Sequence, residues 1–219
     1  MKQKSLLCTG ALALAIGGSR ICLAQMPATP VLQNAWANAG ITIAADYGKA
    51  RDASAFAGAV AWSPRQSRFQ LSAGAGVVRV DSGGSQAGYG GRLSIPLVSF
   101  ASGNLGTAIF GGVGVTSSNG KTLSTFPIGV ALGFRHALGA TRGISAYVAP
   151  FYEITRNKGD SLLDATGGAV RASVGVDLTV APQIGVTVGY EMGADAKENK
   201  PGPRGGVFGV GISYALHRQ

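Results

Sequence analysis

The stretch VGVDLTVAPQIGVTVGYE, residues 174–191, alternates apolar residues with small or polar ones along almost its whole length. Its apolar positions are Val174, Val176, Leu178, Val180, Ile184, Val186, Val188 and Tyr190. A period of two is typical of β-strands with one apolar face. Because Ala181-Pro182-Gln183 interrupts the pattern, the stretch predicts a tight hairpin. The apolar face must contact either a protein core or something outside the molecule.

Segments with the same alternation follow one another from Gly40 to Leu216, and we count ten expected strands. They are Ile41–Gly48, Ala53–Trp62, Phe69–Val80, Ala87–Leu97, Leu105–Thr116, Phe126–His136, Ile144–Glu153, the two strands of the quoted hairpin starting near Ala169, and Val207–Leu216. The seventh is the least regular, because Tyr147 and Phe151 fall on the face opposite its other apolar residues. Lengths of about ten residues match the ~9–11 residues of a tilted transmembrane strand.

Residues 93–120 carry no charge, which raises the alternative of a membrane-spanning helix. Pro96, the cluster SFASGN at residues 99–104 and repeated glycines break this stretch. Two strands around a turn fit it better, because glycine and proline clusters mark turns.

The face opposite the apolar one consists mainly of small residues. Examples are Gly129, Ala131 and Gly133 in the sixth expected strand, and Gly209, Gly211 and Ser213 in the tenth. Glycine makes up 35 of the 219 residues, and charged residues only 13%, about half their usual share. Such a face suits the interior of a narrow barrel, so the apolar face would contact lipid. The sequence predicts an all-β fold, a closed antiparallel up-and-down transmembrane β-barrel of about ten strands, with eight as the alternative.

The N-terminus has the features of a secretory signal peptide. Lys2 and Lys4 precede the apolar run LLCTGALALAIGG (6–18) and the small-residue site CLA (22–24). A membrane-anchoring helix is disfavoured, because the run is shorter than the ~20 residues that a span needs. We therefore expect a signal peptide at 1–24, a flexible periplasmic lead-in at 25–39 and the barrel at 40–219. Both cysteines leave with the signal peptide, as do three basic residues, so the net charge falls from +9 to +6.

Aromatic residues provide an independent test of the barrel. If odd-numbered strands run outward, ten aromatics sort into two levels, as in the girdles of transmembrane barrels. The outer level contains Tyr47, Tyr89, Phe126, Tyr152, Tyr190 and Phe208, and the inner level Trp62, Phe69, Phe134 and Tyr214. The predicted periplasmic turns are short, at 63–67, 137–143 and 181–183. The longest outer connections are Thr155–Gly168 and Met192–Gly206.

At this level the chain resembles the small bacterial outer-membrane β-barrels of the OmpA, OmpX and opacity-protein type. The most specific part is the last expected strand, which alternates through Phe208, Val210, Ile212, Tyr214 and Leu216. That class typically ends on an aromatic residue, whereas this chain has Leu216 followed by His217-Arg218-Gln219. The resemblance implies secretion to the periplasm, contact with the barrel-insertion machinery, and residence in the outer-membrane lipid of a Gram-negative bacterium.

Charged residues on the predicted inner face point to a polar network in the lumen. They are Asp46, Arg79, Arg92, Arg135, Glu153, Arg171, Asp177 and Glu191. Counting back from Pro182 places Glu191 opposite Ser173 and diagonal to Arg171, with Glu153 on the other neighbouring strand. We expect a network centred on Arg171, Glu153 and Glu191, with Arg92 and Asp177 deeper, because unpaired buried charges are costly. The alternative is a selective polar path, although ten strands are well short of the ~16–18 that leave an aqueous channel.

No catalytic residue, metal site or cofactor is expected. Barrel enzymes that this fold resembles place histidine near the outer rim or the lipid face, whereas His136 and His217 lie at the predicted inner end. Asp160 and Asp164 do not have the spacing of an EF-hand loop, and FGGVGV (110–115) is not followed by a helix. The basic residues are scattered singly, which disfavours nucleic-acid binding.

The favoured hypothesis is a non-enzymatic outer-membrane barrel with a plugged lumen. Its role would be structural, or in surface interaction with an unknown ligand through the two longest outer loops. Alternatives are a narrow outer-membrane channel, an outer-membrane hydrolase, and a soluble secreted lipocalin-like barrel that encloses an apolar ligand. Arg65, Arg68, Arg142 and Arg218 of the inner turns are expected to anchor the barrel at anionic head groups.

Overall fold

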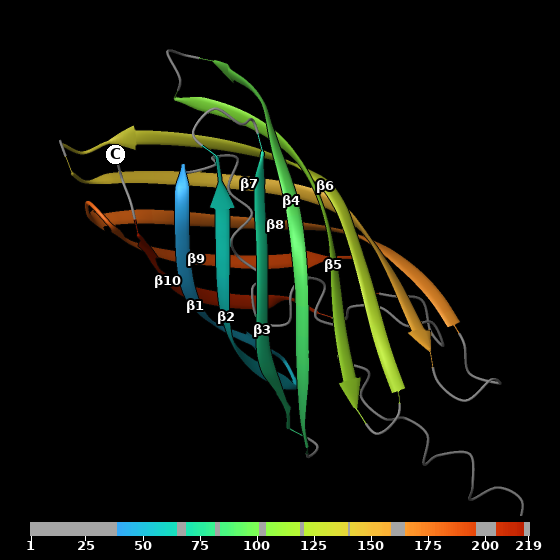
Figure 1. Ribbon diagram of the computed structural model, residues 1–219. Coiled ribbons are helices and arrows are strands. Elements are labelled where there is room, and N and C mark those ends of the chain that lie inside the picture. The colour runs from blue at the N-terminus through green and yellow to red at the C-terminus, as the bar shows by residue number, and fades with distance from the viewer. Residues whose placement is uncertain are drawn as a thin grey trace, which may run out of the picture.

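The chain forms a closed barrel of ten antiparallel strands, each paired with its neighbours in sequence (Figure 1). The computed structural model describes residues 39–64, 69–81, 84–100, 104–118, 121–139, 141–158, 165–195 and 205–216. The strands are β1 (Gly40–Ala50), β2 (Ala53–Ser63), β3 (Gln70–Val80), β4 (Ser85–Phe100), β5 (Leu105–Ser118), β6 (Lys121–Ala137), β7 (Gly143–Lys158), β8 (Ala165–Ala181), β9 (Ile184–Gly193) and β10 (Val207–Ala215). Pairing of β1 with β10 closes the barrel. This confirms the predicted ten-stranded architecture.

The inner end, where β1 begins and β10 ends, is the one predicted to face the periplasm, and the outer end is the opposite one. No helix in the described ranges is long and apolar enough to cross a membrane. The predicted signal peptide and nearly all of the lead-in lie outside the described residues, as do Arg65, Arg68, Asp160, Asp164 and the segment 217–219.

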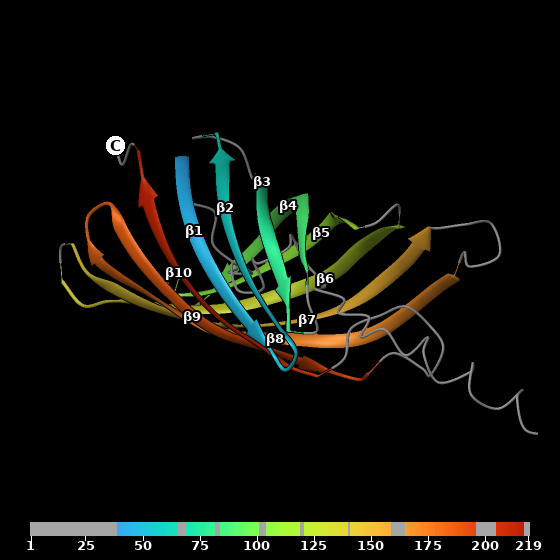
Figure 2. The same ribbon diagram turned by 90° about the horizontal axis from the view of Figure 1, so that it is seen from below.

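The strands β4 to β8 have 14–17 residues, whereas the other five have 9–11. The longer strands extend one side of the wall (Figure 2). Part of the segment Thr155–Gly168, predicted as a loop, is therefore strand, with Thr155 paired to Gly167 and Asn157 to Ala165. The prediction was wrong there because these outer positions are polar, which ends the apolar alternation but not the backbone pairing.

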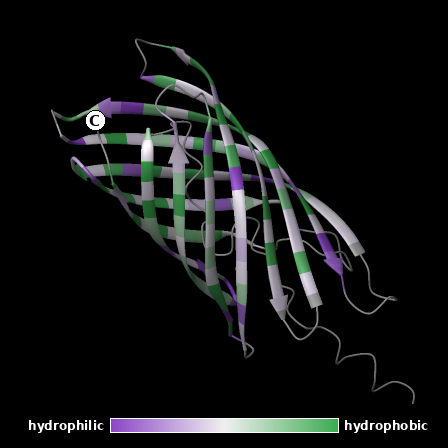
Figure 3. Cartoon of the chain, viewed as in Figure 1, coloured by the Kyte–Doolittle hydropathy of each residue, from purple (hydrophilic) through white to green (hydrophobic). Residues whose placement is uncertain are grey.

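The distribution of apolar and charged side chains is inverted relative to a water-soluble protein. The largest fully buried side chains are Arg171, Glu153, Glu191, Thr155 and Ser173. Phe56 and Val170 are each 63% exposed, and Ile128 is 62% exposed. Apolar positions alternate along each strand with polar or small ones (Figure 3). The apolar faces therefore form the outer surface of the barrel.

The hairpin that opened the sequence analysis shows this inversion directly. Val176 and Val188 pair across β8 and β9 and are exposed, and Val188 in turn pairs with Val210 of β10. Ile212, paired with Val186, is 55% exposed. A lipocalin-like barrel would enclose these residues, so this arrangement contradicts the soluble-carrier alternative.

The predicted girdle aromatics lie on the outward surface. Nine of the ten are exposed, and Phe69 is half-buried, with its ring edge-on to Trp62 at a centroid distance of 5.9 Å. A bulge between Pro96 and Val98 shifts the register of β4, consistent with proline at irregular strand positions. Beyond the bulge Phe100 is exposed and pairs with Leu105, which pairs with Phe134, so it adds an aromatic to the inner level that the sequence analysis did not include.

Candidate functional site: the barrel lumen

An ion pair between Arg171 and Glu191 lies at the centre of the outer half of the lumen. Arg171 Nε donates a hydrogen bond to Glu191 Oε1 at 2.6 Å, and both side chains are at most 1% exposed. Glu191 pairs directly with Ser173, so its contact with Arg171 is diagonal across β8 and β9. The strand register that the sequence analysis counted back from Pro182 predicts this same diagonal contact. Charge-assisted hydrogen bonds of this kind are among the strongest in proteins.

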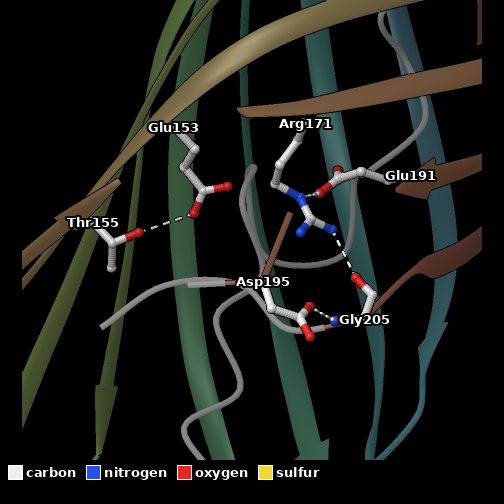
Figure 4. Close-up of polar contacts among 6 residues, drawn as sticks. All are labelled: Glu153, Thr155, Arg171, Glu191, Asp195 and Gly205. Carbon is white, nitrogen blue, oxygen red and sulfur yellow. Dashed lines mark hydrogen bonds and ion pairs between the residues drawn. The ribbon is translucent and has the colours of Figure 1, made fainter. Parts of the chain in front are cut away.

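Arg171 also bonds to one end of the outer connection between β9 and β10, and that end bonds to the other. Its Nη2 donates to the carbonyl oxygen of Gly205 at 2.9 Å, and the Gly205 N–H donates to Asp195 Oδ1 at 2.7 Å (Figure 4). The sequence analysis did not find this contact, because strand register says nothing about loop residues such as Gly205. Arg171 therefore links the lumen wall to the segment that leaves it.

Glu153 and Thr155 extend this buried polar cluster onto β7. Thr155 Oγ1 donates to Glu153 Oε1 at 3.0 Å, and both residues are fully buried. We call Glu153, Thr155, Arg171, Ser173 and Glu191 the lumen plug. A Cβ at Gly193, opposite Arg171, would lie 2.6 Å from the Arg171 Cα, so a glycine is needed there.

An aromatic layer of Phe110, Tyr147 and Phe151 adjoins the plug. All three are at most 5% exposed and cluster with buried alanines of β5, β6 and β7. The Phe110 and Phe151 ring centroids are 6.2 Å apart, and Phe151 pairs directly with Arg171. This explains the irregular seventh segment in the sequence, since its two off-pattern aromatics fill the lumen.

The inner half of the lumen holds a cavity of about 560 Å³, which we call the inner vestibule. Its charged lining residues are Arg92, Arg135, Arg142 and Asp177. Arg92 Cζ lies 5.4 Å from the Phe110 ring centroid, a cation–π distance, so Arg92 borders the aromatic layer. Asp177 accepts hydrogen bonds at both carboxylate oxygens, from Thr187 at 2.6 Å and from Ser145 at 3.1 Å.

The two remaining predicted lumen charges lie outside these groups. Asp46 is buried against Gly211 of β10, and its Oδ2 has no hydrogen-bond partner among the described residues. The inward placement of Arg79 was wrong. Arg79 is exposed and pairs with Ser54, on the same face of β3 as Leu71 and Val77, because side chains two residues apart share a face.

The histidine considered for catalysis is not part of the lumen plug. His136 is exposed at the inner end of β6, where it lines the cavity of the inner vestibule, and its side chain makes no hydrogen bond or ion pair with other described residues. Within the described ranges no group of three or more His, Cys, Asp or Glu side chains has the arrangement of a metal site. His217 lies outside those ranges.

Comparison with known proteins supports the architecture at the level of fold. No family model matches the sequence, and no curated protein matches it. The solved β domain of the Bordetella autotransporter BrkA is similar with a TM-score of 0.53 and 14% identity, over 82% of this chain and 100% of that domain. The KdgM porin in complex with disordered oligogalacturonate is similar with a TM-score of 0.43 and 13% identity, over 80% of this chain and 99% of the porin chain. Neisserial surface protein A is similar with a TM-score of 0.38 and 14% identity, over 81% of this chain and 98% of that protein's chain. The chain has the fold of an outer-membrane β-barrel.

Proposed function

We propose that this protein is a non-enzymatic outer-membrane barrel whose lumen is closed to solutes. In this proposal it resides in the outer membrane of a Gram-negative bacterium after secretion to the periplasm. Lipid covers its outward face, and the insertion machinery assembles it through its last strand. Its role is structural, or in surface interaction at the outer end through the connections between β7 and β8 and between β9 and β10.

The observation that carries the proposal is that two adjoining sets of buried side chains, the lumen plug and the aromatic layer, lie across the lumen. The plug and the aromatic layer touch, since Phe151 pairs with Arg171, and both consist of side chains that are at most 5% exposed. A conducting pore would leave polar side chains along a continuous water-filled path. Here Arg171 Nε and Nη2 bond to Glu191 and to the Gly205 carbonyl oxygen instead of to solvent, and Nη1 is buried without a hydrogen-bond partner among the described residues.

Planar-bilayer recording tests the closed lumen. We expect the purified, folded protein to insert without a large steady conductance. Folding is checked on the same sample by heat-modifiable migration on gels, which distinguishes a closed lumen from failed insertion. A stable open level for folded protein would contradict the proposal and support the narrow-channel alternative.

A survey for hydrolase activity tests the non-enzymatic part. We expect no turnover of ester, peptide or lipid substrates by the folded protein. An activity that disappears in His136→Ala, while the variant still migrates as a folded barrel, would overturn it.

A further inference from the structure

We propose that the inner vestibule binds a small soluble anion that carries carboxylate or phosphate groups, with Arg92 as its main contact. This goes beyond the proposed function, because binding from the inner end does not require passage through the plug. The occupied site would be a dead-end pocket rather than a channel.

Arg92 is the first reason. It forms no ion pair or hydrogen bond with any other residue that the structure describes; its described interactions are a cation–π contact with Phe110 and an electrostatic interaction with Tyr147. Stacking on a ring leaves the in-plane N–H donors of a guanidinium available, and their fork geometry matches carboxylate and phosphate. Arg171, in the outer half of the lumen, has a glutamate partner. An anion bound in the vestibule would give Arg92 a negatively charged hydrogen-bond partner, as Glu191 does for Arg171.

The charge balance of the cavity is the second reason. Three arginines and one aspartate line it, and both oxygens of that aspartate already accept hydrogen bonds from Thr187 and Ser145. Because the arginines outnumber the aspartate, the charge of the lining is positive in a confined space, where electrostatic attraction to an anion is strengthened. Hydroxyl groups of Thr42, Ser72 and Thr179 also line the cavity and can donate to the same ligand.

The size of the cavity indicates a ligand larger than one inorganic ion. About 560 Å³ falls within the range of roughly 300–1,000 Å³ typical of small-molecule sites. A molecule with two or more anionic groups can contact Arg92 together with Arg135 or Arg142. A lipid head group outside the barrel would not reach Arg92, which lines the cavity and borders the aromatic layer at Phe110. We therefore assign the site to a soluble ligand.

Isothermal titration of the folded protein in a neutral sugar detergent tests the site, with citrate and inorganic pyrophosphate as probes. We expect saturable one-site binding of at least one probe, weakened roughly tenfold or more by Arg92→Gln, because hydrogen bonds to charged groups are the stronger ones. Arg135→Gln should weaken binding severalfold. Arg79→Gln is the matched control, since it removes the same charge from the outward face, and it should leave binding unchanged.

Three results would overturn the proposal. One is no binding of either probe by the intact protein. Another is equal weakening by Arg79→Gln, which would indicate attraction to net charge alone. The third is binding of phosphatidylglycerol vesicles but of neither soluble probe, which would assign the arginines to lipid. If Arg92→Gln fails to fold on the gel assay, Arg135→Gln decides, and unchanged binding in that variant also overturns the site.

Discussion

The outer and inner halves of the lumen are built on the same strands but use arginine in different ways. In the outer half Arg171 is fully buried, paired with Glu191 and bonded to the Gly205 carbonyl group. In the inner half Arg92 borders an open cavity and lies against an aromatic ring, and no described carboxylate pairs with it. The difference is that charges in the outer half are paired with one another, whereas Arg92 in the inner half has no carboxylate partner among the described residues.

The physical basis of this contrast is the supply of acidic residues. Glu153 and Glu191 occupy inward positions on the strands flanking Arg171, where buried charges need partners. Around the vestibule the corresponding inward positions carry serine, threonine and alanine, with Asp177 held by two hydroxyl groups.

The largest effect is expected from Arg171→Ala. This change leaves Glu191 buried without its cation and removes the bond to the outer connection. Removing one partner of a buried ion pair typically costs about 3–5 kcal/mol, so the free energy of unfolding should fall by about that amount. Urea unfolding in lipid vesicles measures it. Arg156→Ala, an exposed position of β7, is the control and should change stability by less than about 0.5 kcal/mol. A loss below about 1 kcal/mol for Arg171→Ala would show that the plug is not stabilising.

The contact between the plug and the aromatic layer is tested by two glycine-to-alanine changes. A Cβ at Gly129 would lie 2.5 Å from the Phe151 Cβ, whereas a Cβ at Gly58 meets nothing closer than the Ala44 oxygen at 3.9 Å. Overpacking costs about 1–3 kcal/mol, so Gly129→Ala should lower the unfolding free energy by that much. Gly58→Ala should be neutral or slightly stabilising, because alanine restricts the unfolded chain. Equal effects of the two changes would mean that the lumen at Phe151 is loosely packed.

The barrel itself was predictable from sequence because period two identifies the face of every second residue. The hairpin between β8 and β9 even gave the Glu191–Ser173 register, since Pro182 marks its turn. Arg79 was placed on the wrong face because apolar residues occupy both faces in the run Val77-Val78-Arg79-Val80, although Arg79 has the same parity as the outward Leu71 and Val77.

Other features of the lumen depend on three-dimensional closure. The bulge between Pro96 and Val98 moves even-numbered residues of β4 from the inward to the outward face, so Phe100 is exposed. The contact of Arg171 with Gly205 joins a strand to a loop 34 positions away. The vestibule brings together Arg92, Arg135 and Arg142 from separate strands and turns. None of these is visible in local alternation, although the two off-pattern aromatics of β7 did signal that something other than small residues fills the centre.

A smaller effect is expected from Asp177→Asn, which removes the carboxylate of the vestibule. Anion binding should tighten by a factor of about two to ten, equivalent to no more than about 1.4 kcal/mol, because a nearby negative charge no longer opposes the ligand. Titration with citrate or pyrophosphate measures it beside the intact protein. Weaker binding in this variant, with normal folding, would mean that Asp177 positions donors for the ligand rather than opposing it.

The smallest effect is expected at the outer rim, where Lys49 and Asp81 form an exposed ion pair at 3.4 Å. Their side chains are 44% and 55% exposed, and exposed pairs contribute about 0–1 kcal/mol. Asp81→Asn should therefore lower the unfolding free energy by less than about 0.5 kcal/mol, and high salt should abolish the difference. The same salt series should leave the loss caused by Arg171→Ala nearly unchanged, because solvent ions do not reach a pair that is at most 1% exposed. If salt reduced the loss of unfolding free energy equally in Asp81→Asn and Arg171→Ala, water would have access to Arg171. The division of the lumen into a closed outer half and an open inner half would then be wrong.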